Sequence, residues 1–141
     1  MMARFLFWLT RNRTTRLIKL DGNPYPERHF VTEIMGVCFY LHRFVRDDNE
    51  RHLHDHPWLH AFSIVLHGRY KEQRGIAKQY AGNDYHIDWG FRNVRWFNYI
   101  PRSTDEAAVH RIVNIKPETW TLFFHSSWKF EWGFYKKQFN K

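Results

Sequence analysis

Alternating hydrophobic and polar positions recur along most of this chain, and they predict short β-strands rather than helices. Short apolar-rich stretches that end at turns also predict strands over residues 37–45, 62–66, 94–100, 109–115 and 120–125, and both faces of 37–45 are largely apolar. No helical pattern of ten or more residues separates these stretches, which argues against parallel βαβ units. The pattern therefore predicts an all-β domain, an antiparallel sandwich or barrel.

A second alternation lies near the C-terminus. Trp128, Phe130, Trp132 and Phe134 take every second position and are separated by Lys129, Glu131 and Gly133. A stripe of period two is typical of a half-buried strand, so we expect one over residues 128–134.

The first twenty residues follow a different pattern. Phe5, Leu6, Leu9 and Leu17 fall on one side of a helix, with arginines on the other, which predicts a short helical or extended basic segment packed on the domain. Contact with a membrane surface is the alternative. The apolar run of residues 5–9 is too short for a signal-peptide core or for a membrane span of about 20 residues. We therefore expect no transmembrane segment and a cytoplasmic location, in the host cell if a phage encodes the chain.

Composition narrows the class of protein. The chain has 141 residues, enough for one domain, and 19% of them are aromatic, which excludes general disorder. Its one cysteine, Cys38, excludes an internal disulfide framework and a cysteine-based zinc site.

The formal charge of +8 is concentrated at the two ends of the chain. Residues 1–20 and 136–141 hold basic side chains and no acidic ones, whereas residues 21–135 have as many acidic as basic side chains. We interpret 1–20 as a basic N-terminal segment, 21–135 as the folded domain and 136–141 as a basic tail. The ends would suit nucleic acid or a host protein, or would simply be solvated.

Histidines carry the clearest chemical signal. His52, His54 and His56 alternate, so a strand would project their imidazoles from one face, and His60 follows four residues later. His110 lies in a strand-like stretch and is the best candidate for a ligand from elsewhere in the chain. Neutral imidazole is a common ligand of divalent metals, and three histidines leave positions open for water or substrate. The alternative is a surface strand with incidental histidines.

These motifs resemble the cupin superfamily. The first cupin motif has His-x-His, then a Glu and a Gly; here His54-Asp55-His56 matches, His60 stands at the Glu position, and Gly68 lies near the expected Gly. The second motif has His-x-x-x-Asn, which residues 110–114 match. The resemblance implies a cupin-type β-barrel, or jelly roll, with one divalent ion (Fe, Zn, Ni or Mn) on His54, His56 and His110, and His60 as a possible fourth ligand. It also makes a homodimer plausible.

The chain is more similar still to small cupin-like proteins of phages and bacteria whose function is not known. The shared motifs cover about residues 20–135 and stand at Gly22–Tyr25, Tyr40–Phe44, His54–Trp58, Ser63–Glu72, His110–Val113, Trp120–Phe123 and Trp132–Phe134. Some members are compared with cysteine dioxygenase, another three-histidine cupin.

Three functions are compatible with the sequence. In the first, the chain is a metal-dependent enzyme, dioxygenase-like or related, that binds a small molecule in the barrel. Tyr70 would then donate a proton and Glu72 act as base, because the two share a strand face, and Arg43 would pair with an anionic substrate if it points inward. In the second, the chain is a non-catalytic module whose metal stabilises the fold and whose basic ends bind nucleic acid, a host protein or another subunit. In the third, the chain is a cupin that has lost its metal and stacks a sugar or nucleotide on Trp58 or Trp89.

Overall fold

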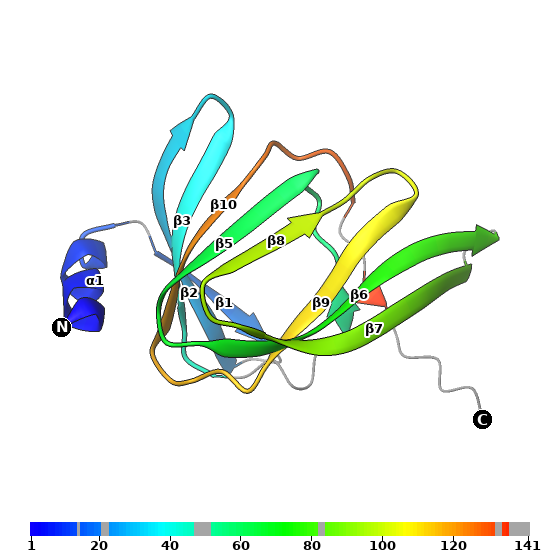
Figure 1. Ribbon diagram of the computed structural model, residues 1–141. Helices are drawn as coiled ribbons and strands as arrows, with labels where there is room; N and C mark the ends of the chain where they lie inside the picture. The colour runs from blue at the N-terminus through cyan, green and yellow to red at the C-terminus, as the bar shows by residue number, and fades with distance from the viewer. Residues whose placement is uncertain (14, 21–22, 47–51, 82–83, 132–133, 136–141) are drawn as a thin grey trace.

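Strands dominate the computed structural model (Figure 1), which describes all residues except 14, 21–22, 47–51, 82–83, 132–133 and 136–141. In chain order its elements are α1 (Met2–Thr10), β1 (Thr15–Leu20), β2 (Asn23–Ile34), β3 (Val37–Phe44), β4 (Leu53–His54), β5 (His60–His67), β6 (Tyr70–Ala81), β7 (Asp84–Val94), β8 (Phe97–Pro101), β9 (Glu106–Val113), β10 (Thr119–His125) and β11 (Phe134–Tyr135). The nine-residue α1 is too short to cross a membrane, and it is the one helix of the described residues.

The strands form two antiparallel sheets. One sheet has the order β1-β2-β3-β10-β5-β8, and the other has the order β11-β4-β9-β6-β7. Figure 1 shows β10, β5 and β8 on one side of the molecule and β9, β6 and β7 on the other. The prediction of an antiparallel all-β domain is confirmed. In the described residues the strands form a jelly-roll-like pair of sheets instead of one continuous hydrogen-bonded cylinder.

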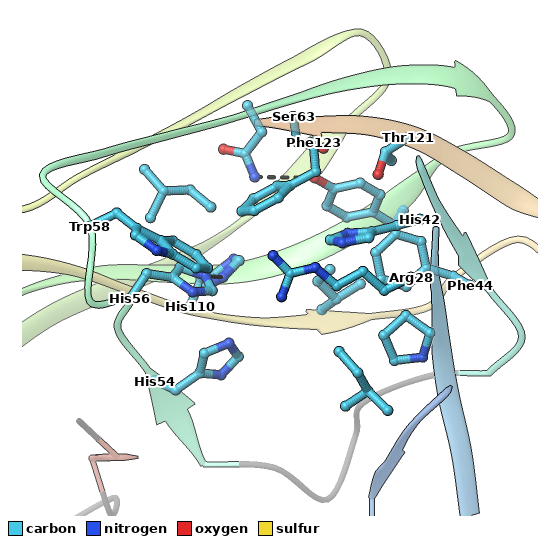
Figure 2. Close-up of a pocket in the computed structure, with 16 residues that line it drawn as sticks. Arg28, His42, Phe44, His54, His56, Trp58, Ser63, His110, Thr121 and Phe123 are labelled. Carbon is cyan, nitrogen blue, oxygen red and sulfur yellow. Dashed lines mark hydrogen bonds between the residues drawn. The ribbon is translucent and has the colours of Figure 1, made fainter. Parts of the chain in front are cut away.

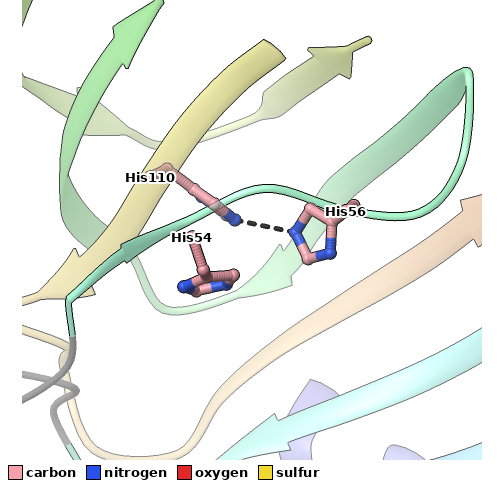
Figure 3. Close-up of side chains that lie close together, drawn as sticks. All are labelled: His54, His56 and His110. Carbon is pink, nitrogen blue, oxygen red and sulfur yellow. Dashed lines mark hydrogen bonds between the residues drawn. The ribbon is translucent and has the colours of Figure 1, made fainter. Parts of the chain in front are cut away.

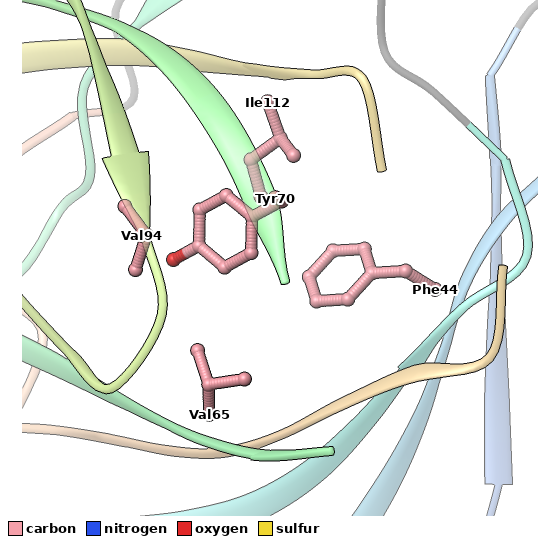
Figure 4. Packing of buried hydrophobic residues seen from close by; sticks show 5 residues of the cluster. All are labelled: Phe44, Val65, Tyr70, Val94 and Ile112. Carbon is pink, nitrogen blue, oxygen red and sulfur yellow. The ribbon is translucent and has the colours of Figure 1, made fainter. Parts of the chain in front are cut away.

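Apolar side chains fill one end of the space between the sheets. Phe44 and Val65 come from the first sheet and pack against Tyr70, Val94 and Ile112 from the second, and all five are at most 7% exposed (Figure 4). Each of these side chains points from its strand into the space between the two sheets. This packing leaves the other end of the space between the sheets for the polar side chains described below.

The N-terminal segment contains the predicted short helix, but the helix does not extend to Leu17. The helix ends at Thr10, whose hydroxyl donates to the carbonyl of Leu6, and residues 15–20 form β1 against β2. Leu6 is buried against Leu41 and Trp120, but Leu17, expected on the same apolar side, is 42% exposed. From Thr15 to Lys19 only Ile18 is partly buried, and these residues are hydrogen-bonded to β2 as a strand instead of continuing the helix.

Two predicted strands are interrupted. The stretch 94–100 contains a turn at residues 95–96, so Val94 ends β7 and Phe97 begins β8. Within the stretch 128–134, the described residues 128–131 form no regular strand, and Phe134 begins the two-residue β11. Trp128 makes one isolated bridge to Trp58, and the N–H groups of residues 129 and 130 both donate to the carbonyl of Pro57. Trp132 and Gly133 lie outside the described residues.

Candidate metal centre and adjoining pocket

Three histidines meet at one edge of the second sheet. His54 in β4 pairs directly with His110 in β9, and His56 follows two residues later (Figure 3). One ring nitrogen of each histidine lies within 4.8 Å of the corresponding nitrogens of the other two. Nε2 of His56 is 2.9 Å from Nε2 of His110. Three imidazole nitrogens this close form a donor set that suits one divalent metal ion.

The guanidinium of Arg102 holds the segment that carries His54 and His56. Asp55 lies between them, is fully buried, and its carboxylate is 3.0 Å from the guanidinium of Arg102. The same guanidinium donates to the backbone carbonyls of His56, at 3.0 Å, and Glu131, at 2.8 Å. Because a buried ion pair with further hydrogen bonds is geometrically demanding, it holds this short segment in one conformation.

The other two histidines of the sequence cluster lie elsewhere. His60 begins β5, is exposed, and its Nδ1 is 2.7 Å from the hydroxyl of Tyr99. Strand alternation explains its position, since His60 and Phe62 lie on the face of β5 opposite the buried Ala61 and Ser63. His52 is exposed as well. The structure therefore brings together His54, His56 and His110, and does not place His60 with them.

Glu72 lies directly behind the three histidines. Its Oε2 accepts from Nδ1 of His110 at 3.1 Å and from the amide of Asn98 at 2.7 Å. Its Oε1 accepts from Nε of Arg92 at 2.6 Å and from Arg74 at 3.5 Å. Both oxygens are thus engaged, and the carboxylate is fully buried.

The surroundings of Glu72 fix its charge and the tautomer of His110. Burial alone would raise the pKa of Glu72, but His110 and the two arginines outweigh it and lower that pKa from 4.5 to about 2. A carboxylate can only accept hydrogen bonds, so the proton of neutral His110 lies on Nδ1. Its Nε2 lone pair is then directed at the other two histidines, as metal ligation requires.

A pocket of about 120 Å³ adjoins the three histidines (Figure 2). Both sheets contribute to its lining, which consists of Ile18, Pro26, Arg28, His42, Phe44, His54, His56, Trp58, Ser63, Tyr70, Asn98, Ile100, His110, Ile112, Thr121 and Phe123. Since one water molecule needs about 10–15 Å³ measured in this way, the space holds a ligand of roughly ten non-hydrogen atoms.

Some of the side chains predicted to bind a ligand line the pocket, and others do not. Tyr70 lines the pocket, and burial together with the nearby charge of Glu72 raises its pKa to about 12. Trp58 also lines it, stacked on His125 with ring centroids 3.8 Å apart. Trp89 is 45% exposed and is not part of the lining. Arg43 is bound to Glu27 and Glu118 and does not line the pocket, so the inward orientation on which its contact with a substrate depended is not found.

Sequence reasoning missed Arg28, Asn98 and Thr121 as pocket residues. His42 also lines the pocket. Burial, followed by the positive charge of Arg28, lowers the pKa of His42 from 6.5 to about 3, so that the His42 side chain is neutral near pH 7. Thr121 lies within the shared motif Trp120–Phe123, but no local pattern marks it, Arg28 or Asn98 as a pocket residue, because strand pairing brings them together.

Comparisons with known proteins support the fold. No protein-family model and no curated protein matches this chain. A single-residue variant of oxalate decarboxylase from Bacillus subtilis superimposes with a TM-score of 0.55 at 15% identity, over 86% of this chain and 29% of that one. The same enzyme at pH 4.6 gives 0.54 at 16% identity, again over 86% and 29%. The chain thus spans under a third of the enzyme's length, and the likeness establishes a cupin-type fold.

Proposed function

We propose that this cupin-fold chain is a metal-dependent enzyme that acts on a small molecule in the pocket. The observation that carries the proposal is the meeting of three imidazole ligand nitrogens within 4.8 Å beside a cavity of about 120 Å³. His54, His56 and His110 would hold one divalent ion such as Fe, Zn, Ni or Mn. Three protein ligands leave coordination positions for water and substrate.

A bound ion would supply Lewis-acid or O2-activating chemistry to a substrate in the pocket. The chain's own part begins with Glu72, which orients His110 by accepting its Nδ1 proton. Carboxylates in this position raise the basicity of a ligating histidine and fix its ring. We therefore assign Glu72 a positioning role, because its oxygens are occupied and it does not line the pocket.

Tyr70 is the residue that we assign to proton donation. Its side chain lines the pocket, and its hydroxyl accepts from the Asn98 amide at 3.1 Å. With its pKa raised to about 12, Tyr70 keeps its proton at neutral pH and can donate a hydrogen bond to a substrate oxygen. Apolar neighbours such as Phe44 and Ile112 keep water away from this end of the pocket.

Metal titration of untagged protein tests the proposal. We expect about one divalent ion per chain in the wild type and loss of that binding in His54→Ala and His110→Ala. His60→Ala is the matched control, because this exposed histidine lies on the outer face of β5, and it should bind metal like the wild type. Equal binding by the His110→Ala and wild-type proteins would contradict the assignment.

A further inference from the structure

Three polar side chains form a row across the wall of the pocket in the first sheet. Arg28 in β2 is directly opposite His42 in β3, and His42 is directly opposite Thr121 in β10. Directly paired side chains on one sheet face have Cβ atoms about 5 Å apart. All three residues line the pocket, and Figure 2 shows the Arg28 guanidinium reaching into it on the side of the three histidines.

Each member of this row has a buried polar atom without a hydrogen-bond partner among the described residues. These atoms are Nε of Arg28, Nε2 of His42 and Oγ1 of Thr121. Buried polar groups in folded proteins are nearly always paired, because an unpaired one loses its hydration without compensation. Three such atoms in adjacent positions of one pocket wall point to a ligand that completes their hydrogen bonds.

The charge of the pocket selects the kind of ligand. Arg28 is the one side chain with a permanent charge among the described residues that line the pocket, and no carboxylate lines it. Arg28 is held in place by the ring of Tyr40, at 3.7 Å from its centroid, and by Nε2 of His125, at 3.2 Å. Neither contact neutralises its charge, so within the described part of the chain the wall presents a cation without a carboxylate partner, together with side chains that can donate hydrogen bonds.

We infer that the pocket binds a small carboxylic acid as its anion, with the carboxylate on Arg28, His42 and Thr121 and the rest of the molecule directed at the three histidines. This inference rests on the proposed function, which makes the pocket a substrate site. A planar guanidinium matches a planar carboxylate and binds it strongly through charge-assisted hydrogen bonds. Apolar lining residues such as Phe44, Ile100 and Ile112 suit a short hydrocarbon chain, and a nucleotide exceeds the available volume.

Binding of butyrate and of its neutral isostere butyramide, measured by ligand-observed NMR, tests this inference. We expect the wild type to bind butyrate at least tenfold more tightly than butyramide. Arg28→Gln should weaken butyrate binding ten- to a hundredfold and leave metal content unchanged, and Thr121→Val should weaken it several-fold. The matched control is Arg95→Gln, because this arginine is exposed and lies outside the pocket, and it should bind butyrate like the wild type.

The same titrations distinguish failure of this inference from failure of the proposed function. Equal binding of butyrate and butyramide to metal-loaded wild type would overturn the carboxylate assignment and would not contradict the metal site. Tighter binding of inorganic phosphate than of butyrate would have the same two consequences. If the protein took up no metal but bound butyrate in a way that depended on Arg28, the anion site would be supported and the proposal of a metal-dependent enzyme would be refuted. The comparison of the two isosteres is repeated on metal-free wild-type protein, where no metal can bind the carboxylate, so it remains decisive if a variant fails to fold.

Discussion

Replacement of Glu72 by Gln should weaken both the fold and the metal centre. The four groups that contact the carboxylate, from His110, Asn98, Arg92 and Arg74, are all donors. A glutamine has one accepting oxygen, so in either orientation its NH2 group faces two donors. An unsatisfied buried group costs about 1–3 kcal/mol, and loss of one partner from a buried ion pair costs about 3–5 kcal/mol.

The pH dependence of stability gives a similar value for the contribution of Glu72 to the free energy of unfolding. The pKa of Glu72 falls from 4.5 to about 2 on folding. Since the folded pKa is the lower one, the stabilisation is present above pH 4.5 and is lost as the pH falls toward 2. This shift corresponds to about 3 kcal/mol. We therefore expect Glu72→Gln to lower the free energy of unfolding of the metal-free protein at pH 7 by about 3 kcal/mol.

Urea denaturation and metal titration check this prediction together. Loss of the carboxylate behind a ligating histidine typically lowers metal affinity ten- to a hundredfold. The control is Glu106→Gln, since Glu106 pairs at 2.9 Å with Lys78 on the surface and both side chains are more than half exposed. If Glu72→Gln matched this control in stability and metal affinity, the role that we assign to Glu72 would be refuted.

Two further predictions concern the backbone and the histidines. Gly68 has a φ of +83°, and an added Cβ would lie 2.9 Å from Cα of Thr119, so Gly68→Ala should lower the melting temperature by well over 5 °C. Gly36 has a φ of +78° but faces open space, so Gly36→Ala should lower the free energy of unfolding by only about 1 kcal/mol. Equal losses would contradict the close approach at Gly68. Because the pKa of buried His42 falls to about 3, the unfolded state binds a proton below pH 6.5 that the folded state does not. Metal-free protein should therefore lose up to about 5 kcal/mol between pH 6.5 and 3, and His42→Asn should flatten this dependence in urea titrations at several pH values; an unchanged slope would argue against it.

Local patterns predicted the parts of the fold that depend on a single strand. Alternation placed β5 and β10 well, because one face of each is buried and the other is less so, whereas in β3 the buried Leu41 and Phe44 lie on opposite faces. It failed at residues 95–96, where the apolar pattern continues through the turn between β7 and β8 with Trp96 79% exposed. It failed again for β1, where Leu17 and Ile18 fit a helical stripe as well as a strand.

In the candidate site, too, local motifs predicted some residues, and only strand pairing brings the others together. His54 and His56 share a short motif, and His110 lies in a second motif, so sequence indicated the three residues that the fold brings together. The row of Arg28, His42 and Thr121 spans 94 positions of the chain and exists only through the register of β2, β3 and β10. Sequence spacing does not encode register between distant strands, and for this reason Arg43 was chosen in place of Arg28.

The central claim is that one metal ion binds to His54, His56 and His110. Anomalous diffraction from crystals of the untagged protein, recorded on both sides of the absorption edge of the metal that it carries, tests this claim most directly. We predict one anomalous peak in contact with all three imidazoles, and its loss in His110→Ala crystals. A peak elsewhere in the molecule, or none in protein that has been offered the metal, would contradict the claim.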